Sequence, residues 1–395
     1  MIYGRMPARS AWSVNLATQR KNARSKKKGT DEAPIEDVNL SAAGLLYDMA
    51  ALQPTERSQL GYKRAARAIV TLPVDVSELV ASGRLQEVPF VGPSSARIIT
   101  ELVREGKSAS VEAALAASRK TSKVEEGRAL RNHFLSAHAM ERVQAASLPA
   151  SIVSRASYRG DFQMHSTWSD GAESIATMAD ACIARGWSCM GVTDHSHGLA
   201  IAKGMSMESA IQQQAEIDRL NAGYKGRFRI FKGIEANVLA DGSLDLSVEE
   251  RRQFEYVVAA PHAVLRRMDD QTSRMLAAVN APGVAMLGHP RGRVYGARGG
   301  VVADWPRVFA AAAARQVAIE IDGNWHRQDI DWTLAELALD AGCIFGLDSD
   351  GHSVDELKFT DYAIAHARLA RIPSTRVINC WTDQQLEAWM SERHG

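Results

Sequence analysis

Short apolar runs alternate with helical spacings through the second half of the chain. From Arg159 onward the helical stretches include SIATMADACIARG and SMESAIQQQAEIDRL. Between them lie strand-like runs, namely DFQMHS, SCMGVTDHSH, FRIFKGIEAN, FEYVVAAPH, VAMLGHP, VAIEIDGN and CIFGLDSDGH. Strands that alternate with helices indicate parallel βα units, and the seven runs predict an α/β barrel or a doubly wound sheet over residues 156–395.

The pattern over residues 39–120 is helical instead. Apolar positions three and four apart predict a helix in NLSAAGLLYDMAAL, with Ser41 as a candidate N-cap, and another in GYKRAARAIVTL that stops at Pro73. A third, DVSELVASG, is expected to end at Gly83. In VPFVGPSSARIITELVREG, a Pro, a Gly and a Pro precede an amphipathic helix whose first backbone amides point outward. That helix start predicts an anion site, and a nucleic-acid phosphate is one candidate occupant.

The segments on either side of this helical region differ from it in charge and pattern. Residues 121–155 begin with TSKVEEGRALRNHFLSAHAMERVQAAS, which predicts a single helix, and we interpret them as a connector. Residues 1–38 show no apolar period and are predicted to form a disordered basic tail, either simply solvated or a non-specific nucleic-acid arm. The first thirty residues carry eight cations and no acid, so the formal charge of +1 conceals −7 on residues 31–395.

Composition restricts where the protein is expected to work. The four cysteines form no CxxC pair, which favours a reducing, cytoplasmic setting. The chain has no apolar run of about 18 residues, and no apolar segment follows the basic N-terminus. Neither membrane spanning nor secretion is therefore expected.

The strand-like runs finish in metal-ligating side chains. In parallel α/β barrels this edge carries the active site, so residues from separate strands converge on one cavity. Imidazole and carboxylate groups without thiolates suit Zn, Mn or Fe, and clusters of two or three such ions hydrolyse phosphate esters. The candidate residues are Gln163, His165, Asp170, Asp194, His195, Glu235, His262, His289, Asp350 and His352.

Six of these segments resemble the metal motifs of the PHP (polymerase and histidinol phosphatase) family: QMHSTWSDG, GVTDHS, KGIEANVLADGSLDL, APH, LGHPRGR and DSDGHS. The resemblance covers about 235 residues and is close to the C-terminal PHP domain of bacterial family X DNA polymerases. It implies a distorted seven-stranded (β/α) barrel, similar to a TIM barrel, that holds two or three divalent metal ions.

The resemblance also implies roles for individual residues. Glu235 is expected to bridge two metals and to act in catalysis with His165 and Asp350. The implied ligands are His165 and Asp350 at the first metal, His262 and His289 at the second, and Asp170, His195 and His352 at a third. The family's HxH opening is here Gln163 and His165, and an amide oxygen is a weaker ligand than imidazole. This departure implies looser or more selective occupancy of the first site.

A metal-activated water is expected to attack phosphorus, so no Ser or Cys nucleophile is required. The Gly-rich segment HPRGRVYGARGG carries Arg291, Arg293 and Arg298 as candidate phosphate-binding cations, with a solvated loop as the alternative. His197 is a candidate proton donor to the leaving group, with an ordinary loop residue as the alternative.

Residues 40 to 120 resemble the small N-terminal DNA-binding domain of family X DNA polymerases, which contains a helix-hairpin-helix motif. The first hairpin glycine of the family is here Phe90, and the family's lyase lysine aligns with Ile98, so sugar-phosphate lyase activity is not expected. A protein-interaction bundle is the alternative for this region. The DNA contacts that the resemblance implies are Gly92, Pro93, Ser94, Ser95 and Arg97.

The two resemblances together predict a metal-dependent phosphoesterase that acts on DNA, as a 3′–5′ exonuclease or end-processing enzyme in repair. A polymerase active site does not fit into the short connector between the two regions. The alternatives are a small-molecule phosphatase of the histidinol-phosphatase type and a non-catalytic DNA-binding protein whose metal site has degenerated. The expected partner is DNA, bound through its backbone, or a small phosphate ester; the sequence leaves the oligomeric state open.

Overall fold

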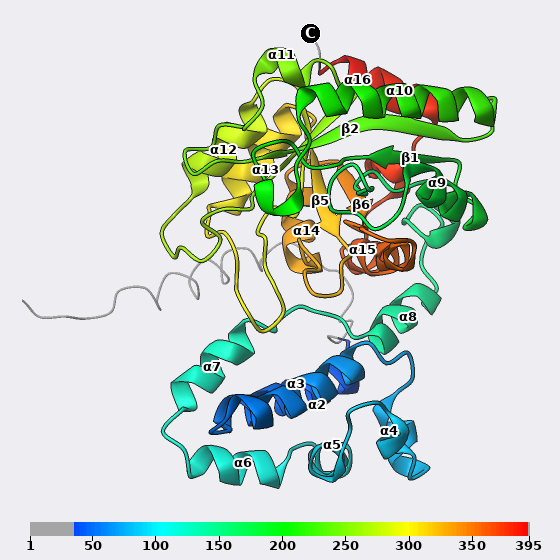
Figure 1. Ribbon diagram of the computed structural model, residues 1–395. Coiled ribbons are helices and arrows are strands. Elements are labelled where there is room, and N and C mark those ends of the chain that lie inside the picture. Colours follow the sequence, from blue (N-terminus) through cyan, green and yellow to red (C-terminus); the bar gives the residue numbers. More distant parts are fainter. Residues whose placement is uncertain (1–34, 394–395) are drawn as a thin grey trace, which may run out of the picture. The chain divides into compact units, whose positions relative to one another are not determined.

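The computed structural model describes residues 35–393 (Figure 1). The tail predicted over residues 1–38 thus lies almost entirely outside the described residues. Among the described residues, no helix combines the length and the apolar character that a membrane crossing requires.

The region over residues 39–120 is helical, as predicted. Its first helix is capped by Asp37 rather than Ser41, because the Asp37 carboxylate accepts the amide of Leu40. Gly83 and Gly106 follow the third and fourth α-helices with φ of +70° and +72°, a left-handed conformation that glycine adopts without strain. The elements are α2 (Val38–Leu52), α3 (Glu56–Val70), α4 (Val76–Ala81), η1 (Leu85–Glu87), α5 (Pro93–Glu105) and α6 (Ala109–Ala116).

The connector is not the single helix that its sequence predicts. It forms α7 (Thr121–Ala129) and α8 (Ala137–Ala145), separated by residues 130–136. Phe134 and Leu135 in this break are buried, and the Gln328 side chain exchanges hydrogen bonds with both backbone groups of Leu135. Docking onto the α/β region therefore outweighs the helix propensity of the connector.

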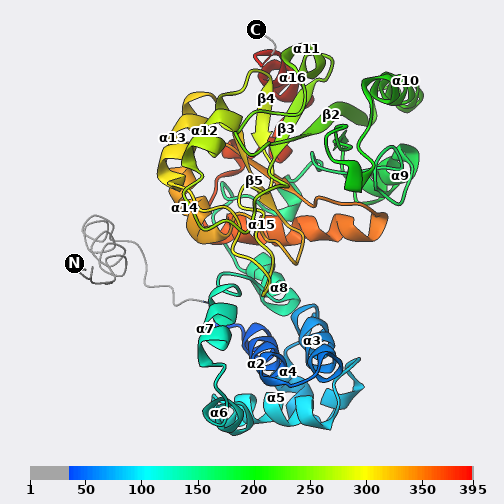
Figure 2. The ribbon, with the colours of Figure 1, turned by 60° about the vertical axis from the view of Figure 1, so that its left-hand side comes forward.

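The α/β region contains one sheet of six parallel strands in the order β1 to β6. The strands are β1 (Cys189–Val192), β2 (Arg229–Asn237), β3 (Tyr256–Ala260), β4 (Val284–Leu287), β5 (Ala318–Asp322) and β6 (Phe345–Asp348). The sheet curls, and α-helices cover its outer face: α9 and α10 pack against β1 and β2, and α12 and α13 pack against β4 and β5 (Figures 1 and 2). The α-helices are α9 (Ile175–Ala184), α10 (Met207–Tyr224), α11 (Val248–Arg251), α12 (Thr272–Asn280), α13 (Trp305–Ala314), α14 (Trp332–Asp340), α15 (Thr360–Leu369) and α16 (Asp383–Ser391).

The prediction of a seventh strand is wrong, because the run DFQMHS over residues 161–166 is not a strand. The segment lies between the edges formed by β1 and β6: it accepts the amide of Thr193 and donates to the carbonyl of Gly351. Its ladder is interrupted because the Asp348 carboxylate, rather than a strand carbonyl, accepts the amide of Phe162. The segment thus takes the place of a seventh strand without continuous pairing.

Apolar packing covers both sides of the curled sheet. Outside, Ile319 and Ile321 of β5 join a large core with α12 to α15. Inside, Phe162 and Tyr256 are fully buried and pack in a cluster that includes Trp389 of α16. Burial of each such large side chain stabilises the folded state by roughly 1.5–3 kcal/mol. This apolar interior leaves the C-terminal strand ends as the place for polar side chains.

Candidate metal centre

Histidines and carboxylates from neighbouring strand ends meet at one edge of the sheet. Glu235 lies on β2, and the other members come from the segment 161–166 with the loop after it and from the loops that follow β1, β3, β4 and β6. Because the strands are parallel and neighbours in the chain are neighbours in the sheet, their C-terminal ends adjoin. We call this set the histidine–carboxylate cluster; its members are His165, Asp170, His195, Glu235, His262, His289, Asp350 and His352.

Glu235 is the centre of the cluster, with two imidazoles against each carboxylate oxygen. Its Oε1 lies 3.3 Å from His262 Nε2 and 3.0 Å from His289 Nε2. Its Oε2 lies 3.4 Å from His165 Nε2 and 3.0 Å from His195 Nδ1. A carboxylate with donors gathered at both oxygens is arranged as a bridge between two cations.

Two further carboxylates complete the cluster. Asp350 Oδ1 lies 3.1 Å from His165 Nε2, on the side of Glu235 that the sequence assigned to a first metal. Asp170 Oδ1 lies 3.3 Å from His352 Nε2 and 3.6 Å from His195 Nε2. The grouping differs from expectation in one respect, because His195 faces Glu235 as well as Asp170 and so adjoins two of the expected sites.

The spacing of the donor atoms fits metal coordination. In a tetrahedral zinc site with bonds of about 2.0–2.1 Å, neighbouring ligand atoms are about 3.3–3.4 Å apart. The nitrogen–oxygen distances around Glu235, Asp350 and Asp170 fall between 3.0 and 3.6 Å. Three groups of at least three such residues each bring their donor atoms within 4.8 Å of one another. The residues present therefore fit divalent metal ions.

The electrostatics favour protonation states that bind metals. Burial would raise the pKa of Glu235, but His195 and His262 outweigh it and hold the pKa well below its usual value. Burial lowers the pKa of His165 well below its usual range and that of His289 to about 4. The carboxylate is thus charged while these two imidazoles are neutral, which leaves their nitrogen lone pairs free for coordination.

Gln163 is fully buried, and neither its amide oxygen nor its amide nitrogen has a hydrogen-bond partner. An unsatisfied buried polar group costs roughly 1–3 kcal/mol. The orphaned amide is a second indication, besides the donor spacing, that this interior accommodates a group beyond the protein's own side chains.

Two residues that the sequence prediction missed lie beside the cluster. Arg327, in the loop after β5, forms an ion pair with Asp350 and lies 3.3 Å from Asp322. Glu320 of β5 is fully buried and accepts the backbone amide of His289. Arg327 follows a strand end like the other members, so the same positional signal could have identified it.

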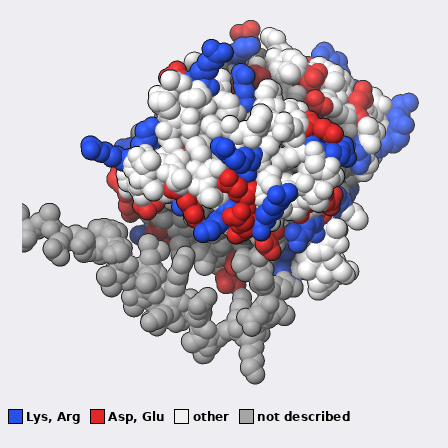
Figure 3. All heavy atoms as spheres, turned by 90° about the horizontal axis from the view of Figure 1, so that it is seen from below, with Lys and Arg blue, Asp and Glu red and all other residues white. Residues whose placement is uncertain are grey.

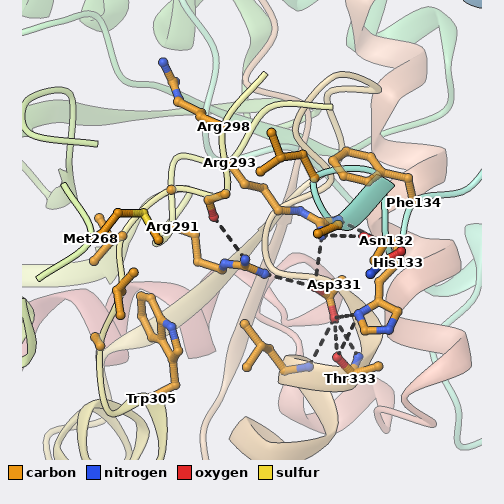
Figure 4. A pocket seen from close by; sticks show the side chains of 18 residues that line it. Asn132, His133, Phe134, Met268, Arg291, Arg293, Arg298, Trp305, Asp331 and Thr333 are labelled. Carbon is orange, nitrogen blue, oxygen red and sulfur yellow. Dashed lines mark hydrogen bonds and ion pairs between the residues drawn. The ribbon is translucent and has the colours of Figure 1, made fainter. Parts of the chain in front are cut away.

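The arginines proposed to bind phosphate point elsewhere. Arg293 is buried: its Nε and Nη2 donate to backbone carbonyls, and its Nη1 donates to a carbonyl and to Asp331 at 3.0 Å. These bonds use all of the N–H groups that a guanidinium has. Arg291 also pairs with Asp331, at 3.2 Å, whereas Arg298 donates to the carbonyl of Gly292 and points away from Asp331 (Figure 4). We therefore assign Arg293 a structural role.

The side chains of two other candidates, His197 and Asp194, form no ion pair with the described residues of the histidine–carboxylate cluster. His197 is an exposed loop residue after β1. Asp194 is buried and accepts hydrogen bonds from Ser166, Ser169 and Gln213, so it organises the loop that precedes the cluster instead of facing a metal.

The predicted DNA-binding residues form the start of α5. Gly92 is the N-cap, Pro93 opens the helix, and Ser94 and Arg97 are exposed, whereas Ser95 is buried. Cations and acids lie interspersed on the face that Figure 3 shows. The backbone amides at the start of α5 are a candidate site for an anion.

The structure defines a chain in which a helical hairpin domain precedes a parallel α/β domain with a candidate multinuclear metal site. Known proteins confirm the resemblances inferred from the sequence. Residues 38–108 match the family described as helix-hairpin-helix domain. A curated relative, the DNA polymerase/3′-5′ exonuclease PolX of Bacillus subtilis (strain 168), is 32% identical over 251 residues, which are 63% of this chain. The match spans only 44% of that relative's length.

Two solved structures also match part of this chain. The histidinol phosphate phosphatase of Lactococcus lactis, determined with zinc, L-histidinol and phosphate, matches 53% of this chain and 94% of its own, with a TM-score of 0.39 and 18% identity. The putative histidinol phosphatase of Listeria monocytogenes matches 50% of this chain and 97% of its own, with a TM-score of 0.39 and 12% identity.

Proposed function

We propose that this protein is a metal-dependent phosphoesterase that hydrolyses phosphodiesters at DNA ends, as a 3′–5′ exonuclease or end-processing enzyme. The observation that carries the proposal is Glu235, a buried carboxylate with two imidazoles within 3.0–3.4 Å of each oxygen. The Bacillus relative, named a DNA polymerase/3′-5′ exonuclease, supports the same chemistry. The unpaired cysteines are in keeping with a cytoplasmic setting.

The histidine–carboxylate cluster would hold two or three divalent ions, and its nitrogen and oxygen donors suit Zn, Mn or Fe. Such ions supply an activated water and neutralise charge on the phosphate. Glu235 would bridge two ions, with His165 and Asp350 on one side and His262 and His289 on the other. Asp170, His195 and His352 would hold the third.

Arg327 would orient the phosphate. Its side chain is one-quarter exposed and faces Asp350 and Asp322. Asp350 would be shared between this guanidinium and a metal, so Arg327 would lie beside a phosphate at the cluster and would pair with its oxygen. Arginine suits this role because its N–H groups match phosphate geometry.

The helical domain favours DNA over a small phosphate ester. Residues 38–108 match a helix-hairpin-helix domain, and α5 begins at Gly92 and Pro93 with free amides at an exposed surface. Helix starts of this kind bind phosphates of the nucleic-acid backbone without reading sequence. A small-molecule phosphatase has no need of such a domain.

The test uses the full chain loaded with Mn²⁺ or Zn²⁺. Single-stranded DNA labelled at its 5′ end should shorten progressively from the 3′ end, and Glu235→Gln should abolish the shortening. The matched control is Glu208→Gln on the exposed first turn of α10, which should retain full activity. Release of phosphate from histidinol phosphate without cleavage of any DNA would favour the small-ester alternative. A protein that binds DNA but cleaves neither substrate would refute the enzyme.

A further inference from the structure

The exposed face of α3 carries cations that lack acidic partners. Lys63, Arg64 and Arg67 are all exposed, while the opposite face of the helix is buried through residues such as Ala65 and Ile69. In the part of the chain that the structure describes, none of the three cations forms an ion pair with a carboxylate. Unpaired cations on one helix face are available to an anionic ligand.

These cations line a cavity of about 320 Å³. Across it lie Tyr295, Trp325 and His326 from the α/β region, and no acidic side chain is among its described lining residues. The Arg67 guanidinium lies 5.0 Å from the centre of the Trp325 ring, a cation–π contact that holds this cation in place. The cavity is therefore positively charged and partly aromatic.

Phe90 lies next to these cations, in the hairpin before α5. The Arg64 guanidinium is 5.7 Å from its ring centre. The ring is 64% exposed although its residue has φ of +66°, a left-handed conformation that a non-glycine residue rarely adopts. Burial does not account for a large apolar side chain in a strained, solvated position. An exposed ring beside cations is suited to stacking with a nucleic-acid base.

Three successive residues link the lining of the cavity to the metal centre. Trp325 and His326 line the cavity, and Arg327 contacts the ligand Asp350. Burial lowers the pKa of His326 to about 4, with contributions from Arg67 and Arg327. His326 is thus neutral at physiological pH, and the positive charge along this path belongs to the arginines on either side of it.

We propose that Phe90, Lys63, Arg64 and Arg67 form a tract that binds single-stranded DNA and leads its end to the metal centre. Phe90 would stack with a base, the α3 cations would bind successive phosphates, and the cavity beside Trp325 would take the nucleotides nearest Arg327. The tract differs from the amide site at the start of α5 because it uses side chains. As a route for a substrate, it rests on the proposed phosphoesterase function.

Binding tests the cations directly. Fluorescence anisotropy of a labelled (dT)12 strand, measured with the full chain in EDTA to prevent hydrolysis, gives affinity as a function of salt. For Lys63→Ala/Arg64→Ala the slope of log K against log[salt] should become shallower by about 1.4, since each single-strand phosphate contact contributes about 0.7. The control, Arg219→Ala/Arg252→Ala, removes two exposed cations from the α/β region and should leave the slope unchanged. An unchanged slope in the α3 variant would overturn the tract.

Stacking is tested by a matched pair at Phe90. Phe90→Leu keeps an apolar side chain without an aromatic face and should weaken binding at least about fivefold, the lower bound for one stacked base. Phe90→Trp should bind as tightly as the unchanged protein or tighter. Equal affinity of the two variants would refute stacking, and tighter binding of duplex than of single strand would refute the single-strand assignment.

Activity separates this proposal from the proposed function. Neither Lys63→Ala/Arg64→Ala nor Phe90→Leu alters the histidine–carboxylate cluster, so both variants should hydrolyse a small chromogenic phosphodiester at the normal rate while their DNA cleavage slows. Normal DNA binding by Lys63→Ala/Arg64→Ala in an active enzyme would refute the tract but not the phosphoesterase function. Weakened binding in a protein that cleaves no phosphodiester would support the tract and refute the phosphoesterase.

Discussion

Replacement of Arg293 by alanine tests whether this cation binds substrate or holds the fold together. Arg293 connects the connector to the α/β domain: its guanidinium donates to the carbonyls of Asn132 and His133 on one side and of Gln328 on the other. It also lies 3.9 Å from the Phe134 ring centre and pairs with the buried Asp331. Alanine would remove the side-chain donor to the carbonyl of the buried Gln328 and one of the two arginine partners of Asp331.

The expected loss of stability is about 3–5 kcal/mol, the usual cost when one partner of a buried charge pair is removed. Asp331 keeps Arg291 as a partner at 3.2 Å, which argues for the lower part of that range. The lost contact with Phe134 argues for the upper part. Arg298→Ala is the control, because this side chain makes one hydrogen bond to Gly292 and its loss should cost about 1 kcal/mol.

Urea unfolding at constant pH, followed by circular dichroism, measures both variants. Arg293→Ala should shift the midpoint to lower urea and, below its transition, should retain the Michaelis constant of the unchanged protein. A variant that keeps its unfolding free energy within about 1 kcal/mol but shows a raised Michaelis constant would refute the structural role and restore the phosphate-binding prediction.

Three further predictions concern pH, metal content and substrate. Burial lowers the pKa of His366 to about 3, so below pH 6.5, near its pKa in the unfolded chain, the unfolded chain binds a proton that the folded chain does not. This group should therefore lower the free energy of unfolding by about 2 kcal/mol between pH 7 and pH 5. His366→Gln should remove that part of the loss, as measured by urea titrations at the two pH values. Gln163→His should raise the metal content found by elemental analysis, and an unchanged stoichiometry and rate would show that the amide is no handicap. Arg327→Ala should lower kcat/KM for DNA roughly 10- to 150-fold, the equivalent of one hydrogen bond to a charged group, whereas an undiminished value would exclude it from phosphate binding.

The cluster could be predicted from sequence because its information is local. Every apolar run except VAIEIDGN ends in a candidate ligand, and the parallel arrangement brings the ends together without any knowledge of loop geometry. His262 and His289 illustrate this, since each directly follows a strand and each lies within 3.3 Å of Glu235. The position of the His195 side chain could not be predicted locally, because it depends on the parallel pairing of the chain after β1 with β2 at Glu235.

The features that could not be predicted depend on residues far apart in the chain. Leu135 leaves the helix because Gln328 satisfies its backbone, a contact across 193 residues. The segment 161–166 fails to form a strand because Asp348 takes a backbone acceptor's place, across 186 residues. Neither partner is marked by periodicity or spacing, so only the folded chain reveals the competition that each one wins.

Arg293 and Arg327 show why chemistry alone does not identify a substrate-binding cation. Both follow a strand end, and both lie near a member of the metal cluster in the sequence or in space. Arg293 has every N–H group occupied by the protein itself, so a phosphate would have to displace a buried network. Arg327 is paired chiefly with Asp350 and Asp322, carboxylates beside the metal centre. Arg327 thus shares Asp350 with the candidate metal site and would lie beside a phosphate bound there, whereas Arg293 pairs with Asp331, which is not among the candidate ligands.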